Sequence, residues 1–271
     1  MKSICLIFTA ETLTCCMYMQ RILVLLLLSI SLQANAQNDL FGLEKQPARK
    51  GFILGFNTGV DFPGADMAER YGTSWRVGGQ VLYKTKSNWV FGPKFDYMFG
   101  NNLREDSLLA NVVDKYGTFI SNTGQRISAN FYQRGYMVGL QGGRIFNIGK
   151  KNSDNGILAM TTVGFMEHKV FIRDRENAIP SILGEYKKGY DRLTNGWMLE
   201  QYVGYTYFAN NNLLNFHIGL NVTAGFTQGR RDWLYDVRRP GNESRFDLLY
   251  GIRAGWYIPI FKRKSEEFFF E

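Results

Sequence analysis

The segment from Leu214 to Phe226 alternates apolar residues with small or polar ones without a break. Its even positions carry seven apolar side chains, and its odd positions carry Asn, His, Gly or Thr. A period of two is that of a β-strand, in which successive side chains point to opposite faces. A soluble strand needs about five or six residues, whereas a tilted membrane strand needs about nine to eleven. The length of this run therefore favours a strand that crosses a membrane.

Seven further segments between residues 51 and 261 repeat this alternation. They are Gly51–Asp61, Trp75–Lys84, Trp89–Phe99, Phe131–Phe146, Ile157–Lys169, Trp197–Phe208 and Arg245–Phe261. The composition fits such strands, because 15% of the residues are aromatic and 29 are glycine, a mixture that suits pleated strands with one face in lipid. The pattern predicts eight strands.

The connections between these strands alternate in length. The long ones are Phe62–Ser74, Gly100–Asn130, Val170–Gly196 and Thr227–Ser244, and the short ones are Thr85–Asn88, Asn147–Gly156 and Ala209–Leu213. Transmembrane barrels have short periplasmic turns and long outer loops. With an even number of strands, both chain ends lie on the short-turn side. We therefore expect residues 37–50 and the tail 262–271 in the periplasm.

Residues 1–36 have the order of parts of an export signal. Arg21 precedes an apolar run from Ile22 to Leu32, which is followed by Ala34-Asn35-Ala36. The run is far shorter than the roughly 20 residues that span a bilayer as a helix. The pattern predicts a cleaved signal peptide, a mature chain that begins at Gln37 and a true start at Met17 or Met19.

Removal of the signal changes the cysteine count and the charge. All three cysteines precede Gln37, and the mature chain keeps 30 basic and 23 acidic residues, a net charge of +7. A basic chain suits an anionic partner. Because the protein is expected to be exported, anionic lipid head groups or an acidic partner protein are favoured over nucleic acid.

The chain from Gly51 to Phe261 resembles small eight-stranded outer-membrane barrels of the OmpA/OmpX type, in the style found in Bacteroidota. The resemblance implies an all-β, antiparallel, up-and-down transmembrane barrel in the outer membrane, in the broad porin-like class. Relatives of this kind serve as anchors, adhesins, lipid enzymes and subunits of secretion or assembly machines. One departure is the tail, where Lys262–Glu267 and Phe268–Phe270 follow the last strand. The tail could insert, dock a partner or fray.

The strand parity places charges of both signs inside the barrel. The inward set comprises Arg76, Lys84, Lys94, Asp96, Glu200 and Arg253, with the amides of Asn57, Gln80, Gln141 and Asn221 between them. An eight-stranded barrel is just wide enough to be filled by side chains, and unpaired charges there are costly. We expect a paired network of Arg76, Lys94, Asp96, Glu200 and Arg253 that plugs the lumen. A gated pore is the alternative.

Two histidines, His168 and His217, are the candidates for catalysis. Barrels that modify lipid A need a histidine beside a serine that it activates. Gly219 stands two residues after His217, and Glu167 and Lys169 flank His168. We therefore expect hydrogen-bonded structural histidines, no enzyme activity and no cofactor. Two histidines without cysteine are also too few for a metal site.

The long loops hold the candidates for interaction. Residues 107–114 are apolar at helical spacing, which predicts a short helix that covers the barrel. The loop 170–196 carries Arg173, Asp174, Arg175 and Glu176, followed by Lys187 and Lys188. The last long loop carries Arg230, Arg231, Arg238 and Arg239 around Trp233 and Tyr235.

Arginines interleaved with aromatic residues suit interfaces and phosphate groups, although solvated loops of mixed charge look similar. The sequence favours a non-enzymatic, structural or accessory barrel that presents its loops to a partner protein or to lipopolysaccharide. A narrow passive pore and a lipid A modifying enzyme are the alternatives.

Overall fold

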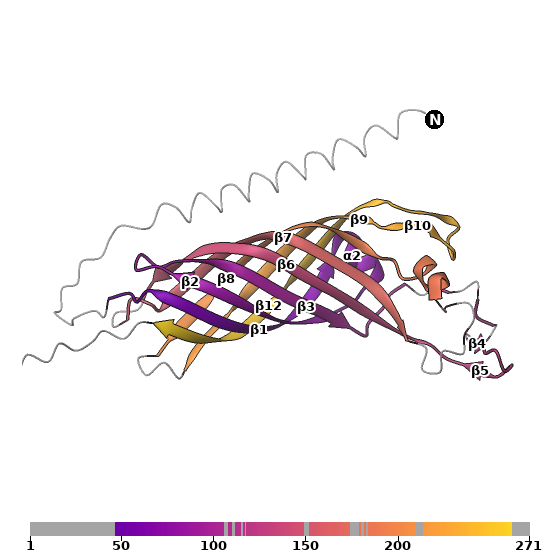
Figure 1. Ribbon diagram of the computed structural model, residues 1–271, viewed down its shortest axis with the longest axis horizontal. Coiled ribbons are helices and arrows are strands. Elements are labelled where there is room, and N and C mark those ends of the chain that lie inside the picture. The colour runs from indigo at the N-terminus through magenta and orange to yellow at the C-terminus, as the bar shows by residue number, and fades with distance from the viewer. Residues whose placement is uncertain are drawn as a thin grey trace, which may run out of the picture. The chain divides into compact units, whose positions relative to one another are not determined.

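The computed structural model describes residues 47–105, 108–109, 112–114, 116, 118–148, 152–173, 179, 182, 184–209 and 214–261 (Figure 1). The predicted signal peptide, the mature N-terminus at Gln37 and the Phe268–Phe270 tail lie outside these residues. These predictions therefore stay untested. Within the described residues, no helix is long and apolar enough to cross a bilayer.

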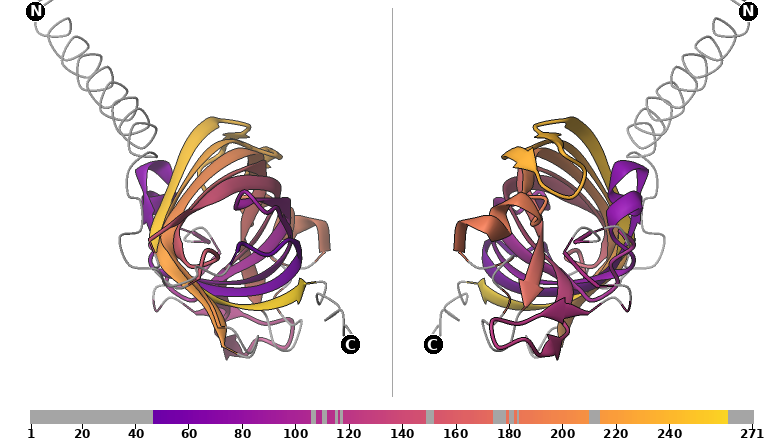
Figure 2. Two further views of the ribbon diagram at one scale, coloured as in Figure 1. Left: turned by 90° about the vertical axis from the view of Figure 1, so that its left-hand side faces the viewer. Right: turned by 90° about the vertical axis from the view of Figure 1, so that its right-hand side faces the viewer.

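Eight long antiparallel strands form a closed barrel (Figures 1 and 2). They are β1 (Gly51–Gly64), β2 (Ser74–Lys84), β3 (Trp89–Gly100), β6 (Asn130–Asn147), β7 (Gly156–Arg173), β8 (Thr194–Phe208), β9 (Asn215–Gly229) and β12 (Ser244–Phe261). Each long strand pairs with the next along the chain, and β12 returns to pair with β1. The predicted eight-stranded, up-and-down barrel is confirmed. Most strands extend a few residues further toward the long loops than the alternation indicates.

The two ends of the barrel differ. Gly51 at the start of β1 pairs with Phe261 at the end of β12, at the end of the barrel that lies on the left in Figure 1. The three short connections, which follow β2, β6 and β8, reach the same end. We call it the turn end, and we call the opposite end, which carries the four long connections, the loop end.

The long connections contain secondary structure that periodicity does not predict. It comprises helix α2 (Ala65–Arg70), the hairpin of β4 (Phe119–Ile120) and β5 (Arg126–Ile127), the 3-10 helix η2 (Gly184–Gly189) and the hairpin of β10 (Arg231–Leu234) and β11 (Arg239–Gly241). All of these elements lie at the loop end (Figure 1). The long connections therefore give the loop end secondary structure of its own.

The helix predicted at residues 107–114 is wrong in its described part. Leu108, Leu109 and Val112 lie in turns, and Leu109 has a φ of +68°, which no residue of a right-handed helix can adopt. Leu109 is nevertheless fully buried and belongs to the same apolar cluster as Tyr71 and Met98.

The outer wall of the barrel is apolar along its middle and aromatic at both ends. Exposed aliphatic side chains form the middle band: Val77, Val81, Val138, Leu140, Val163, Leu199, Val203, Leu220, Val222 and Ile252. Exposed aromatic side chains flank it, with Phe52, Trp89, Tyr205 and Trp256 toward the turn end and Trp75, Tyr97, Trp197, Phe226 and Phe246 toward the loop end. A hydrocarbon-facing band between two aromatic girdles is typical of outer-membrane barrels.

The inward side chains form successive layers along the barrel axis, and strand β1 contributes one residue to each of three layers. Along β1, the inward side chains Ile53, Asn57 and Asp61 belong in turn to an apolar layer, an amide layer and an ionic layer. At the loop end, a second apolar cluster that includes Met67, Met98 and Met166 lies above the ionic layer. The lumen is therefore filled along its length.

Candidate functional site

The ionic layer of the lumen is organised around one carboxylate, that of Glu200 on β8. It accepts hydrogen bonds from Arg76 Nη1 at 2.5 Å, from Arg253 Nη1 at 2.7 Å and from Lys94 Nζ. Strand β2, which carries Arg76, lies directly opposite β8 in the ring of eight strands. The bond between Glu200 and Arg76 therefore spans the full width of the lumen.

Two aspartates complete the layer. Arg76 Nε donates to Asp61 Oδ2 at 2.7 Å, and Lys94 Nζ lies 2.9 Å from Asp96 Oδ2. Asn221 also donates to Asp61, at 3.0 Å. The network thus contains three cations and three carboxylates, so its formal charges cancel. All five predicted members meet here; Asp61, which sequence reasoning did not select, is the sixth.

The members of this network are sealed from solvent. The side chains of Arg76, Lys94, Asp96, Glu200 and Arg253 are each at most 1% exposed. The guanidinium of Arg253 also lies 4.2 Å from the ring centroid of Tyr202, a favourable cation–π contact. Burial of these charges in the middle of the lumen is the arrangement that the plug prediction expects.

The predicted inward residue Lys84 lies apart from this network, at the turn end. Its Nζ donates to Asp154 Oδ1 at 2.7 Å, and Arg49 Nε donates to Asp154 Oδ2 at 2.6 Å. This ion pair ties the segment before β1 to the connection between β6 and β7. It seals the turn end below the apolar layer.

His217 belongs to the amide layer. Its Nε2 lies 3.0 Å from Asn57 Oδ1, and its Nδ1 lies 2.8 Å from the Tyr202 hydroxyl. Gln80 donates to Asn57 at 3.1 Å and accepts from Gln141 at 2.6 Å. Both ring nitrogens of His217 therefore have buried hydrogen-bond partners, as expected for a histidine that stabilises the fold.

His168 is buried beneath the loop-end apolar cluster. Its Nε2 lies 2.9 Å from Asp247 Oδ2, which also accepts from the Thr227 hydroxyl at 2.5 Å, and its Nδ1 lies 3.4 Å from the Tyr71 hydroxyl. In the described part of the chain, no serine bonds to either histidine. The same part contains no cluster of three or more acidic, histidine or cysteine side chains that could hold a metal ion.

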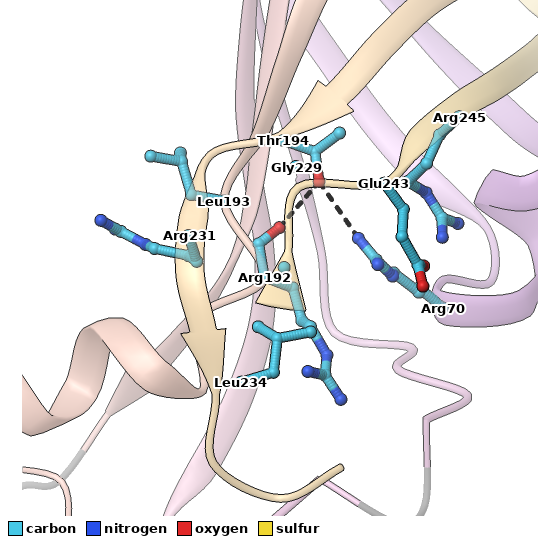
Figure 3. A pocket seen from close by; sticks show the side chains of 10 residues that line it. Arg70, Arg192, Leu193, Thr194, Gly229, Arg231, Leu234, Glu243 and Arg245 are labelled. Carbon is cyan, nitrogen blue, oxygen red and sulfur yellow. Dashed lines mark hydrogen bonds between the residues drawn. The ribbon is translucent and has the colours of Figure 1, made fainter. Parts of the chain in front are cut away.

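A pocket at the loop end gathers four arginines (Figure 3). Arg70 ends α2, Arg192 precedes β8, Arg231 begins β10 and Arg245 lies near the start of β12. Thr194, the first residue of β8, and Glu243, whose carboxylate pairs with Arg239 at 3.0 Å, also line the pocket. Because Thr194 and Arg245 lie on the inward faces of their strands, the pocket opens inside the rim of the barrel. We call it the mouth pocket.

Two of the four arginines are neutralised by carboxylates. Arg192 Nη2 bonds to Glu105 at 2.6 Å and to Asp236 at 2.5 Å, and Arg231 forms a two-pronged pair with Asp191 at 2.7 and 2.5 Å. Burial disfavours the charged form of Arg192, but its bonds to Glu105 and Asp236 outweigh burial and raise its pKa. The pKa of Arg231 is raised by its hydrogen bonds to Asp191.

The six residues predicted as a loop interaction site lie on or beside the hairpin of β10 and β11, but their side chains make different contacts. Arg231 lines the mouth pocket, whereas Arg230 bonds to Asn195 Oδ1 at 2.6 Å on the outward face of β8. Arg239 pairs with Glu243 at 3.0 Å, and Tyr235 packs on Tyr190 at 5.6 Å between ring centroids. Trp233 and Arg238 are exposed. Whether the six residues act together at an interface stays a prediction.

Comparison with known proteins found no matching family model and no curated relative. Among solved structures, the chain is similar to the attachment invasion locus protein Ail of Yersinia pestis in complex with the heparin analogue sucrose octasulfate (9% identity, 77% of this chain and 99% of that chain, TM-score 0.41). It is also similar to Neisserial surface protein A (11%, 77% and 97%, TM-score 0.42) and to the outer membrane protein OprG from Pseudomonas aeruginosa (12%, 80% and 100%, TM-score 0.32). Similarity at this level carries no inference about function.

The charge balance of the lumen predicts how its members respond to substitution. Arg253→Met leaves three carboxylates facing two cations, and an uncompensated buried charge costs about 3–5 kcal/mol. We expect a clear fall in the midpoint of heat-induced unfolding in detergent, followed on gels. Adding Glu200→Gln restores the balance, so the double variant should recover part of the loss. Arg144→Met, on the outer wall near the turn end, is the control. Additive losses would show that the charges are hydrated independently.

Proposed function

We propose that this protein is an integral outer-membrane barrel with a closed lumen that acts without catalysis, as a structural or accessory component. Its loop end faces the cell exterior and meets lipopolysaccharide or a partner protein. The apolar band between aromatic girdles supports residence in a membrane. The sealed ionic layer supports a role other than transport, and the enclosure of both histidines supports a role other than catalysis.

The observation that carries the orientation is a basic patch on the outer wall at the loop end. Arg134 on β6 and Lys169 on β7 are direct cross-strand partners, and both point outward. The guanidinium of Arg134 lies 5.9 Å from the ring centroid of Phe171, and Lys187 Nζ lies 4.9 Å from the same ring. We call Arg134, Lys169 and Lys187 the basic collar.

The collar lacks counter-charges of its own. In the described part of the chain, none of its three cations has a carboxylate within the 4.0 Å distance of an ion pair. The nearby outward acid Glu167 accepts a hydrogen bond from Asn195 at 3.3 Å. Like charges directly opposite on paired strands are destabilising. Phosphate groups of lipopolysaccharide would neutralise them.

Lipopolysaccharide should therefore stabilise the barrel through the collar. We expect added lipopolysaccharide to raise the unfolding midpoint of the detergent-solubilised protein, because each cation near an anionic membrane surface contributes about 1 kcal/mol. The double variant Arg134→Gln, Lys169→Gln should lose most of this rise. The matched control is Arg144→Gln, which removes an outward arginine near the turn end. If the control lost the rise and the double variant kept it, the proposed orientation would be inverted.

The orientation also predicts which positions are reachable from outside the cell. Single cysteines at Asn122, Lys188 and Asn242, all exposed at the loop end, should react with an impermeant maleimide on intact cells. A cysteine at Ser87, exposed in a short turn, should react only after the membrane is permeabilised. The parent chain measures the background. Labelling of the Ser87 site alone on intact cells would contradict the model.

A closed lumen predicts the absence of conductance. The purified full-length protein in planar bilayers should give no steady openings, because the ionic layer leaves no water path between its paired charges. The Arg253→Met, Glu200→Gln double variant, which removes one cation and one carboxylate from that layer and shortens the side chain at position 253, is the comparison in which a leak would appear first. Steady nanosiemens-scale openings of the wild-type protein would refute the closed lumen and favour a passive pore.

A further inference from the structure

Arg70 reaches across the mouth of the barrel. It is the last residue of α2, which packs against β12 and β1, and its Nη1 donates to Thr194 Oγ1 on β8 at 3.1 Å. The Thr194 hydroxyl in turn donates to the Arg192 carbonyl oxygen at 3.0 Å (Figure 3). In the described part of the chain, Arg70 has no carboxylate within ion-pair distance. Within those residues, its side-chain hydrogen-bond partner is thus a neutral hydroxyl.

Arg245 faces the same pocket and is only weakly neutralised. Its Nη2 donates to the Asp66 carbonyl oxygen at 2.5 Å, while its two nearest carboxylates, those of Asp247 and the exposed Glu69, lie at 3.8 and 3.9 Å. The side chain is 8% exposed, and its Nε has no hydrogen-bond partner among the described residues. A buried donor without a partner is unfavourable.

Arg192 is another arginine of the pocket with an unpaired donor among the described residues. Arg192 lines the pocket with a side chain that is 2% exposed. Its Nη2 is paired, but its Nη1 has no hydrogen-bond partner in the part of the chain that the structure describes. Three guanidinium groups of the pocket therefore retain unused hydrogen-bonding capacity or unbalanced charge. Arg231, in contrast, is fully paired with Asp191.

The proximity of Arg70 and Arg245 is electrostatically unfavourable in the free protein. Burial, followed by the charge of Arg245, lowers the pKa of Arg70. Like charges in a partly desolvated site repel unless a counter-ion lies between them. A tetrahedral oxyanion offers several acceptor oxygens and one or two negative charges, and the arginine fork matches it in geometry.

We propose that the mouth pocket binds a phosphate or sulfate group, held by Arg70, Arg245 and the free Nη1 of Arg192. Because the pocket opens inside the rim, the group reaches it along the barrel axis, on a sugar or glycan in the medium. The basic collar faces the membrane instead. The site is therefore distinct from the lipid contact proposed above and goes beyond it.

The test uses the full-length protein in a neutral detergent with inorganic phosphate as the probe. We expect phosphate to raise the unfolding midpoint above that in chloride of equal ionic strength, because a ligand that binds the folded state stabilises it. Arg70→Gln should weaken the apparent phosphate affinity about tenfold, and Arg70→Lys, which keeps the charge without the fork, should fall between. Arg230→Gln, an exposed arginine outside the pocket, should behave as wild type.

Stability without phosphate separates binding from structure. In chloride, Arg70→Gln should leave the midpoint unchanged or raise it, because it removes one of two like charges. A lower midpoint in chloride, together with equal phosphate shifts in wild type and variant, would show that Arg70 is structural and would overturn the proposal. Failure of phosphate to shift any variant would also overturn it.

The source of the anion is resolved by two further probes. A soluble sulfated disaccharide and a soluble phosphorylated sugar should each compete with phosphate in wild type and in the collar double variant Arg134→Gln, Lys169→Gln. Micelles of lipopolysaccharide should compete with phosphate only if their core phosphates enter the mouth pocket along the barrel axis. If the only competitor were lipopolysaccharide, and the collar variant abolished that competition, the binding would belong to the collar and the pocket proposal would fail.

Discussion

The pairing of charges across a narrow lumen is the constraint on which the rest of the barrel depends. Glu200 can satisfy Arg76, Lys94 and Arg253 at once only if four strands bring these side chains to one height. Small residues make room for them: a Cβ at Gly78 would lie 2.1 Å from Asp96 Oδ1, and one at Gly251 would lie 2.6 Å from Asp61 Oδ1. Glycine is needed at these positions for space, and the filled lumen leaves the surfaces to carry function.

The strands and their inward faces could be predicted because the alternation of apolar and polar residues depends only on neighbouring positions in the sequence. The partner of Arg253 could not, because the stagger between strands is set by closure of the whole sheet. Glu200 is two strands away from Arg253, across β9. Asp61 shows the same limit, since its inward position follows from parity but its bond to Arg76 depends on the register of β1 with β2.

The loop end was predicted less well because its order comes from contacts distant in sequence. Sequence reasoning selected Arg230 to Arg239 because aromatic residues lie beside them, yet the mouth pocket joins Arg70 from the first long connection to Arg245 of the last strand. Closure of β1 on β12 brings those two segments together, as the bridge between Ala65 and Asp247 shows. No local sequence pattern marks Arg70 or Arg245. To predict that they meet, one would have to know the register in which β1 pairs with β12.

The distribution of charge connects the closed lumen to the two proposed anion contacts. The chain carries a net charge of +8, yet the ionic layer, with three cations and three carboxylates, contributes nothing to it. The excess positive charge therefore lies outside this layer. Among the described residues, part of it meets no carboxylate: the collar presents Arg134 and Lys169 sideways to the membrane, and the mouth pocket presents Arg70 along the axis. Cations that a fold can pair are buried in pairs at a desolvation cost. Those left half-buried without partners are where an anion from outside would gain most.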